Sequence, residues 1–403
     1  MTTELTSLKE HYLRCVRCGQ CRSVCPVFEE IGNETATPRG KVFLAHMLAG
    51  GELKADAEVA RKLSLCLLCQ ACTKECPSAV PVHKIITAAR CRLAREISNP
   101  LQKLVFREIW ARPSLLNIST RLFRGCQDLG LTGLGRSLGL LPPALDLAGR
   151  LPRRPARCYI REITKAEGAP KMRVGYFLGC TTNLLFPNVA RSTVAVLSRL
   201  GCEVVTPRDL KCCGLPQEEN GQIDAAETLE KFNFAAFQRQ GVDAVVTDCA
   251  SCFAALKESI AFKGMEIMDL SSLLNDLLAG REIKKSSGTT TYHDPCHLAK
   301  AQGITAAPRQ LLDRTCAAFI EMPGANNCCG SGGTFSLYHY DTSMDILDKK
   351  ISSIKETGAE VVATCCPSCT MQIRHGLLKN GLNISVEHPV EILAQSLGIS
   401  FKA

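Results

Sequence analysis

The sequence is poor in aromatic residues and lacks a long apolar run. Phe, Trp and Tyr make up 5% of the 403 residues, and there is a single tryptophan. The leucine- and glycine-rich stretch 129–151 is interrupted by Arg136, two prolines and Asp146, so it predicts no membrane-spanning helix. The first ten residues hold no apolar signal core, which favours a cytoplasmic location.

Several chemistry-bearing patterns are also missing. No G-x-G-x-x-G lies at a predicted strand–helix junction, so we expect no flavin on this chain. No Ser/His/Asp set or carboxylate pair suggests hydroxy-acid oxidation here. Few aromatics and no recognition motif argue against nucleic acid as a partner.

Cysteine, by contrast, is abundant, with 24 residues. Eight of them form two C-x₂-C-x₂-C-x₃-C-P runs, the bacterial spacing for iron–sulfur ligation. In proteins with two such runs, three cysteines of each hold one cluster and the cysteine before proline holds the other. The spacing therefore predicts two [4Fe–4S] clusters, one on Cys15, Cys18, Cys21 and Cys76, the other on Cys66, Cys69, Cys72 and Cys25. Disulfides are the alternative, which a chain without an export signal disfavours.

A second cysteine pattern is duplicated beyond residue 170, at an offset of 116 to 117 residues. Each copy has one cysteine, then a Cys-Cys-Gly, then a C-x₂-C. The first copy comprises Cys180, Cys212, Cys213, Cys249 and Cys252; the second comprises Cys296, Cys328, Cys329, Cys366 and Cys369. The glycine after each pair predicts a sharp backbone turn against a cluster or ligand.

The residues around these cysteines predict alternating strands and helices in each copy. Strands are expected in the runs 173–180, 203–207 and 242–247, and again in 289–296, 318–322 and 359–364; helices at 187–200, 224–240, 308–314 and 342–357. Such alternation indicates a parallel α/β sheet, whose sites form at the carboxyl ends of strands. The cysteines fall there.

Three interpretations of the five-cysteine sets remain open. They are buried thiols of a core, a zinc site with four of the five, or an iron–sulfur cluster with up to five thiolates. Six further cysteines are expected to be small buried hydrophobes, namely Cys91, Cys126, Cys158, Cys202, Cys316 and Cys365.

The net charge of +9 is concentrated in the segment 101–161, which holds eleven Lys/Arg against three acids. Apolar residues recur there at roughly helical spacing, from Leu104 to Phe123. A basic amphipathic helix can lie on an anionic membrane or dock an acidic partner, and a packed connector is the alternative. If the helix docks, reversing Arg153, Arg154 and Arg157 weakens association.

The two ferredoxin runs followed by two Cys-Cys-Gly repeats resemble the iron–sulfur subunits of glycolate oxidase and D-lactate dehydrogenases. Pro38-Arg-Gly-Lys-Val-Phe-Leu44 and Cys328-Cys-Gly-Ser-Gly-Gly-Thr-Phe335 are similar to that family. The resemblance implies an α-helical ferredoxin-like N-terminal domain followed by two homologous α/β Cys-Cys-Gly domains. The expected divisions are 1–100, a linker at 101–170, 171–288 and 289–403.

The resemblance also implies a function and partners. The chain would pass electrons from a separate FAD-containing subunit, which oxidises glycolate or D-lactate, to a downstream acceptor. Acceptors or contacts to consider are an electron-transfer flavoprotein, a quinone and the cytoplasmic face of the membrane. One or two further clusters, of the noncubane [4Fe–4S] type, are implied for the Cys-Cys-Gly sets.

An alternative is a heterodisulfide-reductase-like subunit that reduces a disulfide at a Cys-Cys-Gly cluster. Both five-cysteine sets are complete, which keeps this activity open. His293 and His297 flank Cys296 in the sequence and are candidate proton donors. More often, a histidine beside a cluster only bonds a sulfur or caps a turn.

Overall fold

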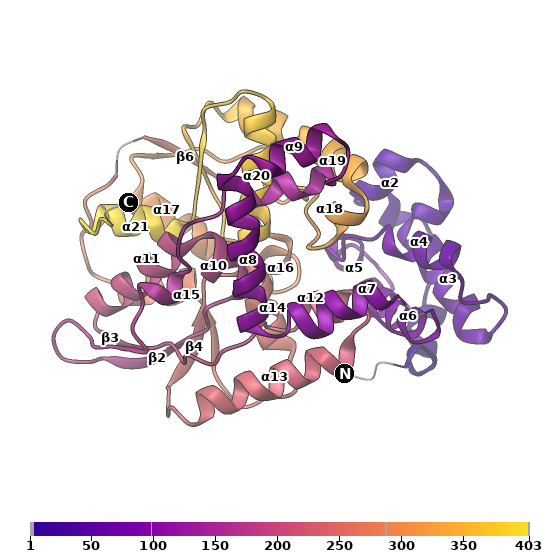
Figure 1. Cartoon of the computed structure of the whole chain (residues 1–403), viewed down its shortest axis with the longest axis horizontal. Helices are drawn as coiled ribbons and strands as arrows, with labels where there is room; N and C mark the ends of the chain where they lie inside the picture. Colours follow the sequence, from indigo (N-terminus) through magenta and orange to yellow (C-terminus); the bar gives the residue numbers. More distant parts are fainter. Residues whose placement is uncertain (1–3, 98, 287, 402–403) are drawn as a thin grey trace.

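The computed structural model describes residues 4–97, 99–286 and 288–401. Helices of the N-terminal part form one end of the molecule, and two α/β halves form the rest (Figure 1). Among the described residues no helix is both long and apolar enough to cross a bilayer.

The N-terminal part is helical, and both cysteine runs lie mainly in the loops between its helices. Proline at the first position starts α2 directly after Cys25, because its missing N–H costs nothing there. Leu48, Ile85 and Ile86 form the centre of a separate small core. The helices are α1 (Lys9–Leu13), α2 (Pro26–Ile31), α3 (Pro38–Gly50), α4 (Ala57–Ser64), α5 (Ala71–Lys74) and α6 (Val82–Glu96).

The basic connecting segment is a series of short helices. Pro113 separates a π-helical turn, Leu104–Ile109, from the next helix, because proline disfavours helical geometry in the residue before it. Phe106 is buried, whereas no residue of α8 is fully buried. The elements are α7 (Pro100–Lys103), α8 (Pro113–Asp128), α9 (Leu131–Ser137) and the 3₁₀ turns Pro143–Ala148 and Ala156–Cys158.

The first α/β half contains a five-stranded sheet with the order β1-β3-β2-β4-β5. Its strands pair in parallel, except that β1 is antiparallel to β3. The strands are β1 (Ile163–Thr164), β2 (Met172–Tyr176), β3 (Cys202–Val205), β4 (Ala244–Thr247) and β5 (Ile267–Asp269). The helices are α10 (Cys180–Leu185), α11 (Pro187–Arg199), α12 (Leu215–Glu219), α13 (Ile223–Gln238), α14 (Ala250–Glu258) and α15 (Leu270–Leu277).

The second half repeats this plan with four parallel strands in the order β7-β6-β8-β9. The predicted parallel α/β content is therefore confirmed, and β1, β5 and β9 are additions that the sequence did not indicate. The strands are β6 (Thr289–Tyr292), β7 (Ala318–Phe319), β8 (Val361–Ala363) and β9 (Ser385–Glu387). The helices are α16 (Cys296–Ala299), α17 (Ala306–Thr315), α18 (Phe335–Tyr338), α19 (Tyr340–Thr357), α20 (Pro367–Lys379) and α21 (Pro389–Ser396).

The two halves share their apolar cores. Leu311 of α17 and Leu393 of α21 are buried in the same cluster as Val174 and Leu197 of the first half. Helices α11 and α21 pack together, as do α14 and α16. This packing turns the carboxyl ends of β4 and β8, each followed by a C-x₂-C, toward one another.

Candidate metal centre

The two N-terminal runs approach each other crosswise. Burial, followed by the thiols of Cys69, Cys66 and Cys25, raises the pKa of Cys72, so Cys25 of the first run lies among the cysteines of the second. In the first run, Cys15 and Cys25 are both close enough to Cys21 to raise its pKa, after burial. Cys25 and Cys21 of the first run thus both lie near Cys72, and the division of the eight cysteines into two ligand sets stays a prediction.

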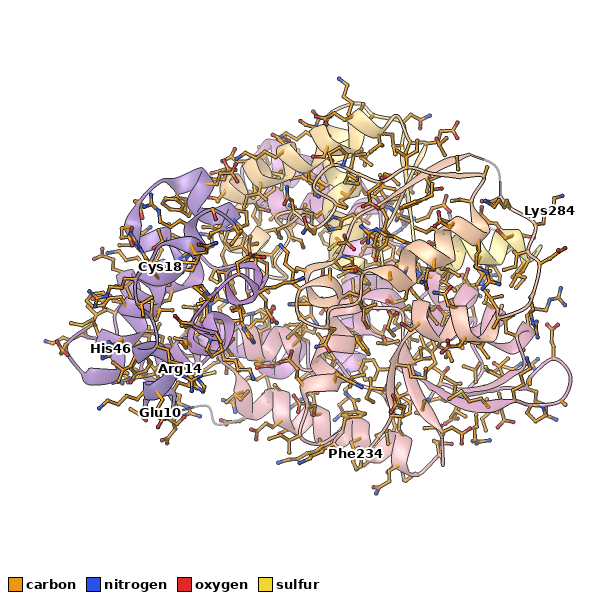
Figure 2. All side chains as sticks on the ribbon, turned by 180° about the vertical axis from the view of Figure 1, so that it is seen from behind. Glu10, Arg14, Cys18, His46, Phe234 and Lys284 are labelled. Atoms are coloured by element: carbon orange, nitrogen blue, oxygen red, sulfur yellow. The ribbon has the colours of Figure 1, made fainter. Side chains whose placement is uncertain are left out.

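The first run is close to solvent. Cys18 is exposed, and Figure 2 shows it in the N-terminal part, at the end of the molecule away from the sheets. Cys15, Cys21 and Cys76 are half-buried. Cys15 and Cys76 pack against the same apolar cluster, as do Cys66 and Cys72, so both runs lie on one core.

The Pro38-Arg-Gly-Lys41 segment braces these loops, a role that spacing alone did not reveal. Arg39 donates to the carbonyl of Arg17 at 2.8 Å and pairs with Glu34 at 2.6 Å. Gly40 has no room for a side chain, since a Cβ would overlap the Glu34 carbonyl. Lys41 is buried and donates to the Ala36 carbonyl, near the thiol of Cys25.

All five cysteines of the first repeat converge at the carboxyl end of the sheet. Cys180 Sγ lies 3.8 Å from Cys212 Sγ. The thiol of Cys213 interacts with those of Cys212 and Cys252, which hold its pKa well below the usual range. Cys252 in turn interacts with Cys249, whose sulfur accepts the Cys252 backbone N–H at 3.4 Å.

The five cysteines of the second repeat converge in the same way. Hydrogen bonds from Cys296 and Cys329 hold the pKa of Cys328 well below its usual range. Cys369 interacts with both Cys329 and Cys366. The Gly330 N–H donates to Cys328 Sγ at 3.4 Å, and its φ of +86° is the left-handed turn expected of the glycine. Gly214 of the first repeat has a φ of +95°.

The two sets meet, which the sequence did not predict. Cys249 of the first repeat interacts with Cys366 of the second. The Ala250 N–H donates to the Cys365 carbonyl at 2.8 Å and fixes one C-x₂-C loop against the other. The ten thiols thus form one continuous series, in the order Cys180, Cys212, Cys213, Cys252, Cys249, Cys366, Cys369, Cys329, Cys328 and Cys296.

The series continues into the N-terminal part through Cys69. Burial, and then the nearby Cys328 thiol, raise the pKa of Cys69 to about 12. Cys69 shares a small core with Leu67 and Phe335, against which Cys296 and Cys328 also pack. One end of the thiol series therefore abuts the second ferredoxin run.

This donor set fits iron–sulfur clusters. All 24 cysteines are free, and thiols are the chief neighbours of the buried thiols. A thiol core gains nothing from such clustering, since deprotonated sulfurs would repel one another without a metal. Structural zinc takes four ligands and would leave a fifth cysteine of each set over. Cys-rich sites with N–H···S bonds are what Fe–S clusters require.

The two histidines lie in different surroundings. His293 is buried with Cys329 and Cys369, their ligand atoms within 4.8 Å of one another, and its Nδ1 has no hydrogen-bond partner among the described residues. Burial lowers the pKa of His293 to about 3, so its ring is neutral. His297 Nδ1 lies 2.9 Å from Ser251 Oγ of the other repeat.

A tyrosine supports each C-x₂-C loop from below. In the first repeat Asp248 accepts hydrogen bonds from the hydroxyls of Tyr176 and Thr182. Burial raises the pKa of this carboxyl to about 6. At the same place in the second repeat, Tyr292 donates to Cys365 Sγ at 3.5 Å. Cys365 is thus a buried hydrogen-bond acceptor beneath the site.

The remaining unassigned cysteines divide into two groups. Cys91, Cys202 and Cys316 are buried, as expected of small hydrophobes. Cys126 is half-buried and Cys158 is exposed, so the expectation is wrong for Cys158, which lies in a surface 3₁₀ turn of the connecting segment.

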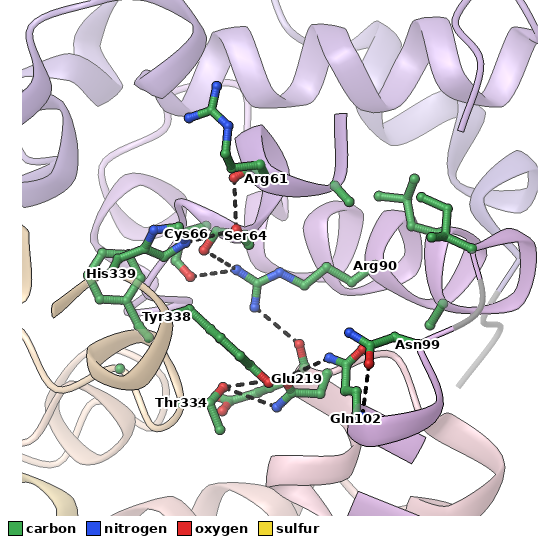
Figure 3. Close-up of a pocket in the computed structure, with 17 residues that line it drawn as sticks. Arg61, Ser64, Cys66, Arg90, Asn99, Gln102, Glu219, Thr334, Tyr338 and His339 are labelled. Atoms are coloured by element: carbon green, nitrogen blue, oxygen red, sulfur yellow. Dashed lines mark hydrogen bonds between the residues drawn. The ribbon is translucent and has the colours of Figure 1, made fainter. Parts of the chain in front are cut away.

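Arg90 of α6 joins the N-terminal part to the first repeat (Figure 3). Its buried guanidinium donates to the carbonyls of Cys66, at 2.7 Å, and Glu219, at 3.1 Å, and to those of Leu63 and Ser64. It borders a cavity of about 360 Å³ that is lined by the N-terminal part and by both repeats. Burial raises the pKa of the Glu219 carboxyl to about 8. Arg90 carried no signal in the sequence.

Comparison with protein families matches three stretches of the chain. Residues 11–80 match the 4Fe-4S dicluster domain. Residues 174–257 and 290–374 each match the Cysteine-rich domain, so the two repeats are homologous units. These matches enclose all 18 cysteines of the two patterns and support iron–sulfur binding.

Full-length relatives cover nearly the whole chain. A probable glycolate oxidase iron-sulfur subunit of Bacillus subtilis is 32% identical over 96% of this chain and 94% of the relative. The glycolate oxidase iron-sulfur subunit of Escherichia coli is 27% identical over 95% and 93%. A dihydromethanophenazine:CoB–CoM heterodisulfide reductase subunit of Methanosarcina acetivorans is 26% identical over 96% and 94%. The chain belongs to the family of glycolate oxidase iron–sulfur subunits.

Proposed function

We propose that this chain is the iron–sulfur electron-transfer subunit of a flavin-dependent 2-hydroxy acid dehydrogenase complex acting on glycolate or D-lactate. The observation that carries the proposal is the thiol series, which runs unbroken from the second ferredoxin run to Cys180. A stand-alone enzyme needs one reaction centre. A row of sulfur sites that spans the molecule suits electron transfer.

The cysteines are assigned as ligands of four clusters. Bound clusters would accept and release single electrons at these places. The two in the N-terminal part take the [4Fe–4S] form, and the Cys-Cys-Gly sets take one cluster each, of the noncubane type. The four ligand sets are Cys15/Cys18/Cys21/Cys76, Cys66/Cys69/Cys72/Cys25, Cys180/Cys212/Cys213/Cys249/Cys252 and Cys296/Cys328/Cys329/Cys366/Cys369.

The surroundings of the sites differ in ways that suit their positions. Burial of Cys249, Cys252 and Cys369 excludes water from the inner sites. Exposed Cys18, in contrast, places the first site within reach of a donor bound at the surface. Leu13 and Val16 are exposed beside it, at 56% and 71%, and are apolar contacts for the FAD-containing subunit.

Co-expression with the FAD-containing subunit tests this function. Anaerobic addition of glycolate or D-lactate to the purified complex should bleach the visible absorption of the clusters. The chain alone should show no bleaching with the same acids, since the acid is oxidised on the partner. Bleaching of the isolated chain, or none in the complex with either acid, contradicts the proposal.

Disulfide reduction is the second candidate. Complete cysteine sets in both repeats favour it, together with the likeness to the heterodisulfide reductase subunit. The chemically reduced chain, without a flavin partner, would then turn over an added disulfide. Absence of turnover leaves electron transfer as the function.

A further inference from the structure

The outer end of the thiol series opens on an apolar cavity. Cys180 is half-buried, unlike Cys212, Cys213, Cys249 and Cys252, and it lines a cavity of about 350 Å³. This volume lies within the range of small-molecule sites. The opposite end, at Cys296 and Cys328, is also half-buried but packs against residues of the N-terminal part. A ligand in the cavity would lie beside the last sulfur of the series.

The cavity wall carries no charged residue among those described. Leu116 and Phe123 of α8, Leu147 and Leu184 supply apolar surface. An anionic ligand would lose its hydration here without gaining an ionic partner, which is unfavourable. The wall therefore disfavours carboxylates, nucleotides and charged disulfides, and suits an uncharged, largely apolar molecule.

Polar side chains also lie in the wall of the cavity. Ser331, Ser336 and Ser368 line it, and their hydroxyls have no protein partner in the described part of the chain. The buried Trp110 indole N–H is directed at the Cys180 thiol, whose pKa it helps to lower. The three serine hydroxyls are available to donate to carbonyl oxygens.

Helix α8 forms the outer wall and is incompletely packed. None of its residues is fully buried, although Leu116 and Phe123 point to the cavity side. Figure 1 shows α8 lying across the repeats. Its other face exposes Ile118 and Leu122, at 52% and 67%, so the cavity is bordered by apolar surface on which a lipid-borne molecule can arrive.

We propose that this cavity binds an uncharged quinone, the terminal acceptor of the series. This inference rests on the proposed function, which supplies the electrons: oxidation of one 2-hydroxy acid by the flavin subunit yields two electrons and two protons. The quinone takes up two electrons delivered through the series and two protons from water, and its two C=O groups become the C–OH groups of a quinol. The serine hydroxyls of the cavity wall orient the carbonyls.

Binding is measured by titration calorimetry of a decyl-substituted benzoquinone into the oxidised, cluster-loaded chain without partner. The variant Ser119→Phe places a bulky ring at the cavity wall and should weaken binding at least tenfold. Ile118→Phe, the neighbouring residue on the exposed face, is the matched control and should bind as the parent does. Ala148→Trp fills the cavity from the 3₁₀ turn and gives a second variant should Ser119→Phe fail to fold.

Three results would overturn the inference: no binding by the parent, equal weakening by Ser119→Phe and Ile118→Phe, or binding of glutathione disulfide in preference to the quinone. The assay contains neither FAD subunit nor hydroxy acid. Failure of the acid-driven bleaching described above would therefore overturn the proposed function and leave quinone binding standing.

Discussion

The two Cys-Cys-Gly sites carry the same five cysteines but face different surroundings. Cys296 and Cys328 of the second site pack against Leu67 and Cys69 of the second ferredoxin run. Cys180, the counterpart of Cys296, lines the apolar cavity. Duplication thus supplied two similar sites, and the packing of the N-terminal part on one of them gave the pair a direction.

The supports beneath the sites differ as well. Asp248 in the first repeat occupies the place of Cys365 in the second. The Ala250 N–H bonds across the pseudo-symmetric junction, but its counterpart Pro367 has no N–H to return the bond. His388 Nε2 donates to the Asp248 carbonyl instead, at 2.9 Å. The two repeats therefore share their five cysteines and differ at single residues that support them.

The largest expected effect comes from breaking one site at a time. Cys329→Ser and Cys213→Ser are equivalent changes, and each should lower the iron content by about one cluster's worth, because a ligand is lost. Cys329→Ser should also stop acid-driven reduction of the Cys-Cys-Gly site in the first repeat. The variant interrupts the series on the side of the ferredoxin run, from which the electrons arrive. Iron analysis and electron paramagnetic resonance of the reduced complex provide the measurements. If Cys213→Ser prevents reduction of the second site, the inferred direction is wrong.

Next in size is the comparison of Asp248→Ala with Cys365→Ala. The first variant leaves buried hydroxyls of Tyr176 and Thr182 without an acceptor and should cost about 3 kcal/mol of unfolding free energy. The second removes a weak O–H···S bond and should cost about 1 kcal/mol. Denaturant unfolding of the loaded, anaerobic protein measures both. Equal losses would show that the two supports are equivalent.

A smaller effect is expected for His388→Ala. The imidazole caps α21 by accepting the Val390 N–H at 3.1 Å and holds the Asp248 carbonyl across the junction. Loss of the cap and of that bond should cost about 2 kcal/mol. His388→Asn, which can still cap the helix, should recover about half of it. The same unfolding assay reports on both, and an unaffected His388→Ala would remove this residue from the junction.

The smallest effect concerns pH. Glu219 of the first repeat has Phe335 at the equivalent place in the second, and both line the cavity beside Arg90. With its pKa raised to about 8, the folded chain keeps a Glu219 proton that the unfolded chain releases near the ordinary pKa of 4.5. This contribution to stability is full at low pH and is lost as the pH rises toward about 8. When the pH is raised from about 6 to about 7, the unfolding free energy of Glu219→Gln should therefore rise by about 1 kcal/mol relative to that of the parent.

Thermal unfolding at both pH values checks this prediction. Asp224→Asn, an exposed change near the start of α13, is the control and should show no such gain. A constant difference between Glu219→Gln and the parent at all pH values would contradict buried protonation of Glu219.

Turns and strands were predictable from the sequence where a few neighbouring residues determine them. Proline after cysteine, glycine after the Cys-Cys pair and apolar runs before the cysteines predicted turns and strands that the structure contains. The edge strands β1, β5 and β9 carried no comparable signal, because they are short and do not lead into a cysteine, as the equally short β8 does. Arg90 was missed because its partners are backbone carbonyls, which leave no mark in a sequence.

The sequence by itself determined the sulfur chemistry, because the ligand spacing of the two runs and the register of the repeats are local or periodic properties. It could not place Cys249 against Cys366, Cys69 beside Cys328, or Cys180 at the wall of an apolar cavity. Those neighbours are more than 100 residues apart or belong to a cavity with walls from several segments. Tertiary packing decided them, since only burial of the shared cores brings the loops together and gives the series two unlike ends.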